Sequence, residues 1–588
     1  MPGLVPCHDC VKIRLGAAHV DTYAPDRYQR SVLIRPRVLQ GLPGYTLQSF
    51  GTDSLAGLIV GVIAVPLSIA VAVASGVGPE QGLATAVIAG MTVALLGGGS
   101  VQVAGPTGTF VVISYAIGSQ FGYPGLALAT LMAGIMMVLM GFANLGKIIQ
   151  YVPYPVVIGF SSGIATVILI SQIGDLLGIS TAGAPPDAPA RLLSYFGNLG
   201  SISIADTTVS IATIAILVLW KRVSGRIPGA LIALIGITGI TALFDLPVVT
   251  IGSRFGSLPR GLQWYGLPPV SFELVQQLMV PAFTIALLSS IESLFTAMVA
   301  DGMVGERHEP NTELVGEGIA NAAAVLFGGI PASGAIARTA TSARNGGRTP
   351  VAAIMNAVFV LLVMSALAPL ASFIPIAALA GVLSVVAWNM AEWRSFRAMI
   401  RGPKSDMLVL ITTFSLTVLI DLSVAIQVGM VLASFLFMRR MSMVSQVTVL
   451  RSERRHQRFE DLQKADIQVR TTSRSIPRGV EVYEINGAFF FGAAEKFRNA
   501  MLLIQKRPKV RILGMRSVNA LDVTGLRLLE DLVNDATSHG GHVVLARLQA
   551  QPERALRKSG LYERIGEENV CETLDAALKR ARTLVETT

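Results

Sequence analysis

The chain has 588 residues, of which 52% are hydrophobic and only 14% are charged, and its mean hydropathy is +0.59. Ordinary soluble domains carry about 25% charged residues, so this composition excludes a soluble globular protein and indicates a membrane protein. The net charge of +10 does not indicate nucleic-acid binding, because basic residues also flank membrane spans on the cytoplasmic side. We therefore expect no nucleic-acid partner.

Residues 1–50 are expected to form a cytoplasmic N-terminal segment, because they lack an apolar stretch long enough for a signal peptide. Cys7 and Cys10 have the C-x-x-C spacing of a metal site, but zinc needs about four ligands and the chain contains no second pair. We expect both thiols to be reduced and no metal to be bound. The first membrane span is expected to serve as the insertion signal.

Residues 51–440 are expected to form a transmembrane domain, because long apolar stretches follow one another with few charges between them. About fourteen stretches approach the roughly 20 residues that span a bilayer, two of them being shorter. An even number of spans puts both ends of the domain on the same side of the membrane. The predicted stretches lie near residues 55–75, 81–98, 106–119, 124–143, 155–177, 203–220, 228–244, 277–300, 314–328, 334–344, 349–368, 373–389, 405–420 and 422–438.

The distribution of basic residues predicts the orientation. The loops expected on the inner side contain clusters such as 221–226 and 394–404, whereas the longer outer loops contain only Arg191, Arg254 and Arg260. An excess of Lys and Arg marks cytoplasmic loops. We expect both termini to be cytoplasmic and the protein to be a multi-pass protein of the cell inner membrane.

Two glycine-broken stretches occupy corresponding positions in the two halves of the apolar region, at residues 95–110 and 326–340. Paired interruptions of this kind point to the binding site of a secondary transporter. Unwound backbone at membrane depth is tolerated only where it lines a cavity or is buried in protein. Two half-helices that start there would direct their positive N-terminal ends at one point, which predicts an anion site.

Beyond Arg439 the sequence becomes charged and then reads as a soluble domain. Residues 441–475 are expected to form a linker. Its basic run 451–458 is expected to contact anionic lipid as a secondary role. Residues 476–588 alternate strand and helix patterns, which predicts a sheet covered by helices. The strands are expected at 481–485, 510–515 and 542–548, and the helices at 493–505, 525–536, 552–559 and 573–584.

Several segments occur in the order found in one known family, namely residues 56–82, 105–107, 290–307 and 328–350, followed by ALDVTGL at 520–526. From residue 45 onward the chain resembles the sulfate permease (SulP) anion transporters, which are related to the animal solute-carrier multifunctional anion exchangers. The C-terminal part resembles a STAS domain.

The resemblance implies an all-α polytopic membrane domain of fourteen segments in two inverted repeats of seven, followed by a small cytoplasmic α/β STAS domain. It further implies a homodimer, alternating access by a core that moves against a gate, and a substrate bound between half-helices that begin near Pro106 and Gly334. It implies no enzymatic activity and no cofactor, and the scattered histidines offer no catalytic or metal cluster.

Arg338 is the first candidate for the anion site, because it is a permanent cation in an otherwise uncharged stretch. Its guanidinium can present a bidentate fork to an oxyanion. The alternative is that it snorkels to the inner surface beside Arg344 and Arg348, and Thr339 and Thr341 are weaker candidates on the same helix. The expected substrate-binding residues are Gly105, Pro106, Thr107, Gly334, Ala335, Ala337 and Arg338.

Glu292 is the second candidate, because it is the only charged residue between Glu273 and Asp301. Ser289, Ser293 and Thr296 share its helical face. Three roles remain open for this carboxyl group: a proton-coupling group, a sodium ligand together with Thr296, or a structural counter-ion to Arg338.

In sodium-coupled bicarbonate members of the family, an acid and a threonine at the positions of Glu292 and Thr296 bind the cation. Small residues at the positions of Gly334 and Ala335 then end in a hydroxyl residue, but this chain has Ile336 there. Proton-coupled symport through Glu292 is therefore the favoured prediction, with Na⁺-coupled bicarbonate symport as the alternative. These five positions are the expected coupling-ion residues.

Sulfate and bicarbonate are the favoured substrates, and a dicarboxylate or chloride carrier or an anion channel of the same fold stays open. Leu67 and Val71 stand where many relatives have a glutamine and an aromatic residue beside the substrate. Thr107 and Thr109 are therefore expected to supply more of the polar contact.

The STAS segment is expected to act as a scaffold or dimer contact. In stand-alone STAS regulators a phosphorylated serine follows the loop aspartate, whereas here Val523 follows Asp522. Thr524 is adjacent and is expected to cap the next helix. We therefore do not expect phosphorylation at this loop.

Overall fold

The structure is a computed structural model that describes residues 35–41, 44–149, 152–179, 185, 187–223, 228–256, 259–366, 368–420, 422–444, 446–452, 468–472, 475–490 and 508–587, with a few positions between 492 and 501. Cys7 and Cys10 lie outside these residues. The chain divides into two compact units, one comprising Met1–Val152 and Ser161–Glu392, the other Pro153–Phe160 and Trp393–Thr588.

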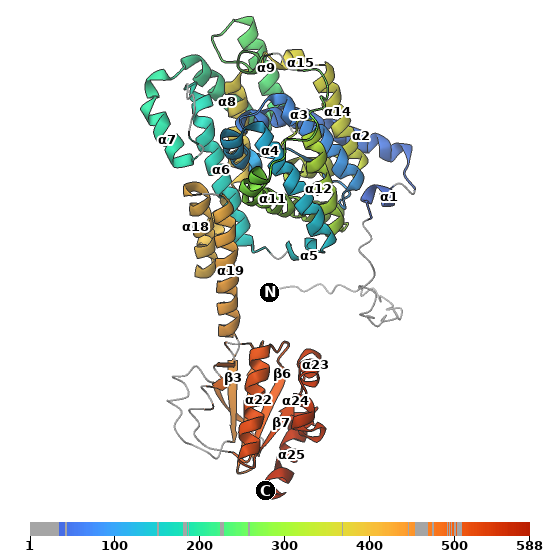
Figure 1. The fold of residues 1–588 in the computed structure, drawn as a ribbon, viewed down its shortest axis with the longest axis vertical. Helices are drawn as coiled ribbons and strands as arrows, with labels where there is room; N and C mark the ends of the chain where they lie inside the picture. The colour runs from blue at the N-terminus through green and yellow to red at the C-terminus, as the bar shows by residue number, and fades with distance from the viewer. Residues whose placement is uncertain are drawn as a thin grey trace, which may run out of the picture. The chain divides into compact units, whose positions relative to one another are not determined.

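Each of the fourteen predicted apolar stretches overlaps a helix (Figure 1). Within the described ranges, seven helices are long and apolar enough to span a membrane. The helices up to residue 444 are α1 (Arg37–Gly41), α2 (Leu47–Ala74), α3 (Pro79–Leu96), α4 (Val111–Phe142), α5 (Gly146–Ile149), α6 (Tyr154–Leu177), α7 (Ala188–Gly197), α8 (Ile204–Val223), α9 (Gly229–Leu243), α10 (Ile251–Phe255), α11 (Phe272–Val304), α12 (Pro310–Leu326), α13 (Ile336–Arg344), α14 (Val351–Ala366), α15 (Ala368–Ala371), α16 (Ile376–Met390), α17 (Trp393–Ile400), α18 (Lys404–Leu419) and α19 (Leu422–Val444).

The boundaries differ from the prediction where local backbone chemistry decides them. The stretches predicted at 106–119 and 124–143 are joined in α4, across a sharp kink at Gly122, which has φ 68° and ψ −177° and precedes Pro124 by two residues. Gly122 adopts this left-handed φ without the steric penalty of a side chain. In α11, the hydroxyl of Ser271 accepts a hydrogen bond from the backbone N–H of Leu274, and Gly305 ends the helix in a left-handed conformation.

Small residues let the helices of the first unit approach closely. A Cβ atom added to Gly134 on α4 would lie 2.6 Å from the carbonyl oxygen of Gly318 on α12, and one added to Gly318 would lie 2.6 Å from the carbonyl oxygen of Gly134. Gly57 on α2 similarly meets the carbonyl oxygen of Ala352 on α14. Such contacts are typical of helix packing in membranes. These contacts pair α4 with α12 and α2 with α14; α3 packs against α2, α12 and α14, and α11 packs against α4 and α12 (Figure 1).

The two glycine-broken stretches meet in a short antiparallel ladder. Strand β1 (Ala104–Gly105) pairs with β2 (Ser333–Gly334), with Ala104 opposite Gly334 and Gly105 opposite Ser333. Both strands are fully buried. The ladder satisfies backbone groups that would otherwise be unpaired at membrane depth. It was not predicted from the sequence.

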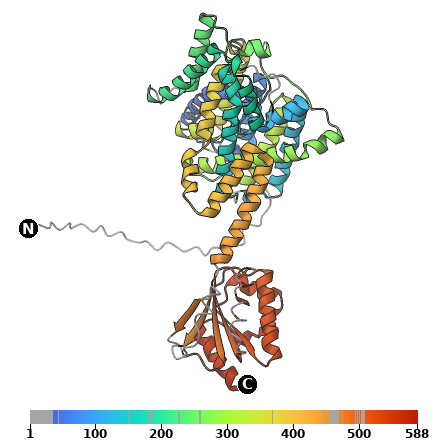
Figure 2. The same cartoon turned by 90° about the vertical axis from the view of Figure 1, so that its left-hand side faces the viewer.

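The C-terminal part contains a six-stranded sheet in the order β4-β3-β5-β6-β7-β8 (Figure 2). Strands β5 to β8 pair in parallel, and β3 pairs antiparallel with β5. The strands are β3 (Gln446–Ser452), β4 (Gln468–Thr472), β5 (Val480–Asn486), β6 (Val510–Ser517), β7 (His542–Ala546) and β8 (Val570–Cys571), and the helices are α22 (Val523–Ser538), α23 (Ala550–Lys558), α24 (Leu561–Ile565) and α25 (Leu574–Thr587).

Two predictions for this part are corrected. Strands β3 and β4 fall inside the expected linker 441–475, because Val449 is buried and pairs with Tyr483 in the sheet. The cap of α22 is Asp522, whose Oδ1 accepts from the backbone N–H of Gly525 at 2.8 Å, and not Thr524. The helix expected at 493–505 lies partly outside the described residues.

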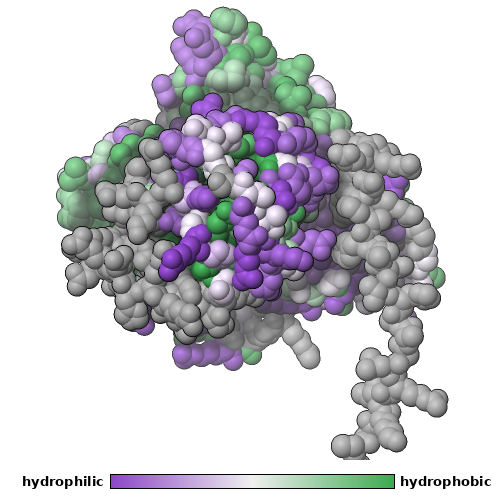
Figure 3. Space-filling model, turned by 90° about the horizontal axis from the view of Figure 1, so that it is seen from below, coloured by the Kyte–Doolittle hydropathy of each residue, from purple (hydrophilic) through white to green (hydrophobic). Residues whose placement is uncertain are grey.

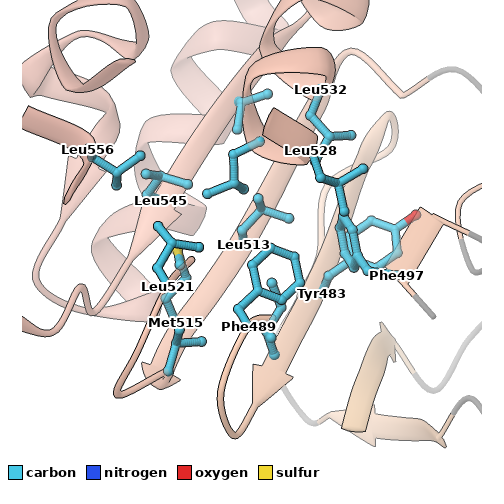
Figure 4. Packing of buried hydrophobic residues seen from close by; sticks show 14 of the residues in the cluster. Tyr483, Phe489, Phe497, Leu513, Met515, Leu521, Leu528, Leu532, Leu545 and Leu556 are labelled. Carbon is cyan, nitrogen blue, oxygen red and sulfur yellow. The ribbon is translucent and has the colours of Figure 1, made fainter. Parts of the chain in front are cut away.

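The sheet has an apolar cluster on each face. Tyr483 and Ile485 of β5 belong to the cluster under α22, whereas Val480 and Val482 belong to the one that contains residues of α25. This alternation follows from the two-residue period of a strand. Figure 4 shows the first cluster, with Tyr483, Phe489 and Phe497 packed together. The face of the molecule seen in Figure 3 is by contrast mostly hydrophilic.

Candidate functional site

The candidate site lies where the two glycine-broken stretches start their helices. We call residues 104–111 the first arm and residues 333–344 the second arm. Beyond the β1–β2 ladder, the backbone N–H of Ala335 donates to the carbonyl oxygen of Val103 at 2.9 Å, and the backbone N–H of Val103 donates to Thr339 Oγ1 at 3.0 Å. These bonds hold the start of α13 against the first arm.

Arg338 lies in the interior between the arms. Its side chain is 0% exposed, so the alternative that it snorkels to the surface is wrong. Its Nη2 donates to Ser68 Oγ and to the carbonyl oxygen of Pro106, both at 3.2 Å. Its Nε and Nη1 have no hydrogen-bond partner in the described part of the chain. A buried donor without an acceptor is costly, so these two nitrogens favour an anionic ligand.

The carboxyl group of Glu292 accepts hydrogen bonds from hydroxyl groups of both arms. Thr107 and Thr109 of the first arm donate to its carboxyl oxygens at 3.1 Å and 3.0 Å, and Ser333 of the second arm donates at 2.6 Å. Hydroxyls can rotate to donate or accept, so this shell suits either the charged or the neutral carboxyl group. Between the described residues Glu292 and Arg338 there is no ion pair, so the predicted counter-ion role does not occur as a direct contact.

Three further hydroxyls of α11 contact the second arm or the residue before it. Thr296 Oγ1 donates to the carbonyl oxygen of Gly334 at 2.9 Å, and the backbone N–H of Gly334 donates to Ser293 Oγ at 2.8 Å. Ser289 donates to the carbonyl oxygen of Ala332 at 2.8 Å. Thr296 and Gly334, both expected to bind the coupling ion, are thus hydrogen-bonded to each other. Their oxygens keep lone pairs for a further contact.

The other expected residues are spread over the arms. Gly105, Pro106 and Ala335 are buried, Ile336 is half-buried and Ala337 is exposed. A Cβ atom added to Gly105 would lie 2.5 Å from Arg338 Nη1, so the guanidinium lies directly against the backbone of the first arm. On the first span, Val71 is buried and Leu67 is half-buried.

Several polar residues around the site are not predicted by the sequence. Ser68 and Ser333 contact Arg338 and Glu292, but single serines in apolar stretches gave no signal. Glu313 and Glu317 on α12 are both 0% exposed. The signal for Glu317 was visible, because it lies inside the predicted stretch 314–328 and ionisable residues in a span are functional by default, whereas Glu313 directly precedes that stretch.

Chemically, the site offers a fixed cation with two unsatisfied nitrogens beside a carboxyl group that is held by three hydroxyls. No group of three His, Cys, Asp or Glu residues suited to a metal ion occurs among the described residues. The arrangement can bind a small anion and can exchange a proton or cation next to it.

Comparisons with known proteins identify related membrane transporters over nearly the whole chain. The Sulfate permease family profile matches residues 50–413, and the STAS domain profile matches residues 473–577. The Bacillus subtilis (strain 168) protein YvdB, a sulfate transporter by provisional assignment, is 40% identical over 90% of this chain and 97% of its own length. The bicarbonate transporter BicA of Picosynechococcus sp. (strain ATCC 27264 / PCC 7002 / PR-6) is 30% identical over 90% of this chain and 94% of its own.

Solved structures share the fold. The overall structure of SLC26A9 superposes with a TM-score of 0.81 at 19% identity and covers 94% of this chain and 93% of its own. The transmembrane domain of a cyanobacterial BicA superposes with a TM-score of 0.60 at 29% identity, covering 66% of this chain and 98% of its own. The chain is therefore a mostly helical membrane protein with a C-terminal STAS domain.

Proposed function

The chain belongs to the sulfate permease family, and we propose that it is a secondary active transporter of a small anion, with sulfate and bicarbonate as the first substrates to test. The sulfate assignment of YvdB and the bicarbonate transport named for BicA support this choice. The chain is a transporter and not an enzyme, because its family and the relatives named above are transporters. Dicarboxylate or chloride transport, and an anion channel of the same fold, are the other functions that a positive pocket of this kind suits.

The observation that carries the proposal is the pair of unsatisfied nitrogens on Arg338. A buried guanidinium keeps its charge at any physiological pH, and its free N–H groups suit the oxygens of an oxyanion. The helix start at Ile336 adds partial positive charge from the second arm, and the start at Gly108 adds it from the first. Gly105, Pro106, Thr107, Gly334, Ala335 and Ala337 would complete the wall around the anion.

For coupling, we favour symport with H⁺ carried by Glu292. Its three hydroxyl partners accommodate either protonation state, and Ile336 lacks the hydroxyl expected for a sodium site. The similarity to BicA and the positions of Thr296 and Gly334 support Na⁺ coupling as the second candidate. In both cases the site alternates its access between the two sides of the membrane as the core moves against the gate.

We further propose an inner-membrane location with both termini in the cytoplasm, because the inner loops carry the basic clusters. The protein is proposed to be a homodimer, with membrane domain 51–440 followed by the STAS domain. Blue-native electrophoresis and cysteine accessibility at the two termini would test the assembly and the orientation.

Uptake into proteoliposomes tests the function. Labelled sulfate and bicarbonate are offered with an inward H⁺ gradient or an inward Na⁺ gradient, each compared with no gradient. Acceleration by H⁺ alone supports proton symport through Glu292, and acceleration by Na⁺ alone makes the protein a sodium symporter. Rapid uptake without acceleration by either gradient would mean exchange or a channel. No uptake of either anion would contradict both proposed substrates.

A further inference from the structure

Helix α12 places two carboxyl groups one turn apart in the protein interior, and their surroundings differ. Glu313 Oε2 accepts hydrogen bonds from the backbone N–H groups of Gly98 and Gly99 at 2.7 Å and 2.8 Å. No hydrogen bond of good geometry reaches either oxygen of Glu317 or Glu313 Oε1 in the described part of the chain, although the Ser293 hydroxyl on α11 lies close enough to interact with Glu317. Both side chains are 0% exposed. The chain therefore offers two backbone donors to Glu313, but to Glu317 it offers no cation and at most one hydroxyl.

Gln102 provides a second, independent observation. It is 3% exposed, and both atoms of its side-chain amide lack partners within the described residues. A Cβ atom added to Gly99 would lie 3.4 Å from Gln102 Oε1 and 3.4 Å from Glu313 Oε2. At its other end, Gln102 Nε2 lies 2.3 Å from the Cβ position of Gly334. This amide thus reaches from the neighbourhood of Glu313 to the second arm.

The neighbouring helices supply no cation for Glu317. The charges that act on it are those of Glu313 and of Glu292 on α11, and both are acidic. Helix α4 contains no charged residue. Glu80 of α3 lies beside Phe327 at the far end of α12, and α5 with Lys147 contacts the first turn of α12. Arg338 is directed at Ser68 and Pro106.

An ionised carboxylate with no cation and at most one hydroxyl donor in a membrane interior costs many kcal/mol, and such a group is neutralised instead. The neutral form has an O–H that needs an acceptor. Glu313 Oε1 is an acceptor without a donor, and residues four apart on a helix have Cβ atoms about 5–6 Å apart. One proton shared by the pair satisfies both groups.

We infer that Glu317, together with Glu313 and Gln102, forms a second proton-binding site behind the anion site, in which Glu317 is the acid and Glu313 is the anion that accepts its hydrogen bond. The ligand is a proton and not a metal cation, because the described residues hold no group of three His, Cys, Asp or Glu suited to a metal. With this proton in place, the charge of Glu313 balances that of Arg338. Of Glu292, Glu313 and Glu317, Glu292 is then the carboxyl group left to change charge during transport, a consequence that rests on the proposed function, whereas the proton on Glu317 does not.

Infrared spectroscopy of the full-length protein in lipid tests the site without measuring transport. A carboxylic acid has a C=O stretch that shifts when H₂O is replaced by D₂O, and a carboxylate lacks it. At neutral pH we expect such a band in the wild type and its loss in Glu317→Gln. The matched control is Glu309→Gln, which changes an exposed carboxyl group one turn before Glu313 and is expected to leave the band unchanged. Glu292→Gln separates any contribution of the anion site.

A second variant keeps the test independent of the folding of Glu317→Gln. In Glu313→Gln, the amide oxygen can still accept from Gly98 and Gly99, but the acid on Glu317 loses its charged acceptor. We expect the band to remain and to move to higher frequency. The inference is overturned if the wild type has no acid band, if the band survives in Glu317→Gln, or if Glu313→Gln leaves its frequency unchanged. Each of these outcomes leaves the proposed anion transport standing.

Discussion

The two arms of the site share a sequence pattern but differ in chemistry. The first arm supplies a backbone carbonyl at Pro106 and two hydroxyls at Thr107 and Thr109, and it carries no charge. The second arm supplies Arg338 and one hydroxyl at Ser333. One arm therefore orients the guanidinium and the carboxyl group, and the other carries the cation. Similar breaks in two halves of a membrane protein predict where a site lies, but not which half supplies the charge and which supplies the neutral hydrogen-bonding groups.

Neither arm has room for a side chain at its glycine, for different reasons. Gly105 has φ 156°, which L side chains rarely adopt, and a Cβ atom there would lie 2.5 Å from Arg338 Nη1. A Cβ atom on Gly334 would meet Gln102 Nε2 at 2.3 Å and the backbone Cα of Ser293 at 3.2 Å. The first arm thus requires glycine for its backbone conformation as well as for its packing, and the second arm requires it for packing alone.

The largest effect is expected from Arg338→Ala, which removes the charge from the second arm. Truncating one partner of a buried charged contact costs about 2–5 kcal/mol, so we expect anion uptake by proteoliposomes to fall to background. Arg338→Lys keeps the charge but loses the fork, and its uptake should be partial. Gel filtration checks that the variants are folded. Wild-type uptake by a folded Arg338→Ala protein would mean that the anion binds elsewhere.

Glu292→Gln tests whether the hydroxyls of the two arms serve a coupling group. The amide keeps the shape but cannot be charged, so we expect accumulation against a gradient to be lost while anion exchange at equilibrium continues. The control is Glu273→Gln, which changes an exposed carboxyl group in the first turn of the same helix. If Glu292→Gln still accumulates anion as the wild type does, Glu292 only holds the arms together.

Alanine at the two glycines separates backbone strain from packing. Overpacking typically costs about 1–3 kcal/mol, so we expect Gly334→Ala to lose stability in this range and Gly105→Ala, which adds the strain of φ 156°, to lose at least as much. Thermal unfolding in lipid or detergent measures both losses. Gly118→Ala is the control, because a Cβ atom there meets nothing within 4 Å on α4. A smaller loss for Gly105→Ala than for Gly334→Ala would show that the first arm relaxes its backbone to accept a side chain.

The smallest effect concerns the approach to the first arm. Ser100 Oγ accepts from Arg37 Nε at 2.9 Å, and both residues donate to Glu306 beyond the end of α11. Partial burial raises the pKa of Glu306, but the hydrogen bonds from Ser100 and Arg37 and the Arg37 charge outweigh it, so that the pKa lies below the ordinary value of 4.5.

A carboxyl group with a lowered pKa in the folded state contributes stability above its unfolded pKa and loses it as the pH falls through the folded value. We therefore expect stability to drop when the pH is taken well below 4.5. The loss should be under about 1 kcal/mol, because the pair is partly exposed. Glu306→Gln should abolish this acid step in thermal unfolding. The hydroxyl groups that hold the second arm do not titrate, so they do not contribute to this acid step. An acid step of unchanged size in Glu306→Gln would therefore assign the loss of stability to another titratable group.

The sequence was sufficient for features that depend on single, conspicuous residues. The apolar stretches predicted the helices, the glycine breaks predicted the arms, and the isolated charges pointed to Arg338 and Glu292. The pairing of Ala104 with Gly334 was not predictable, because strands of two residues have no periodicity. Ser68 in α2 and Ser333 in β2 were missed because serine is common in membrane segments, and only the fold shows which serine reaches a charged group.

The β1–β2 ladder also has a consequence for the biosynthesis and membrane insertion of the protein. The partner of Ala104 in the ladder is Gly334, which is synthesised some 230 residues later (334 − 104). At about 5–20 residues per second, the first arm waits roughly 10–50 s for it. During that time its backbone groups have no ladder to join. A nascent chain arrested before Ser333 should therefore be cleared by membrane proteases faster than one arrested after Arg344, which pulse-chase labelling can measure.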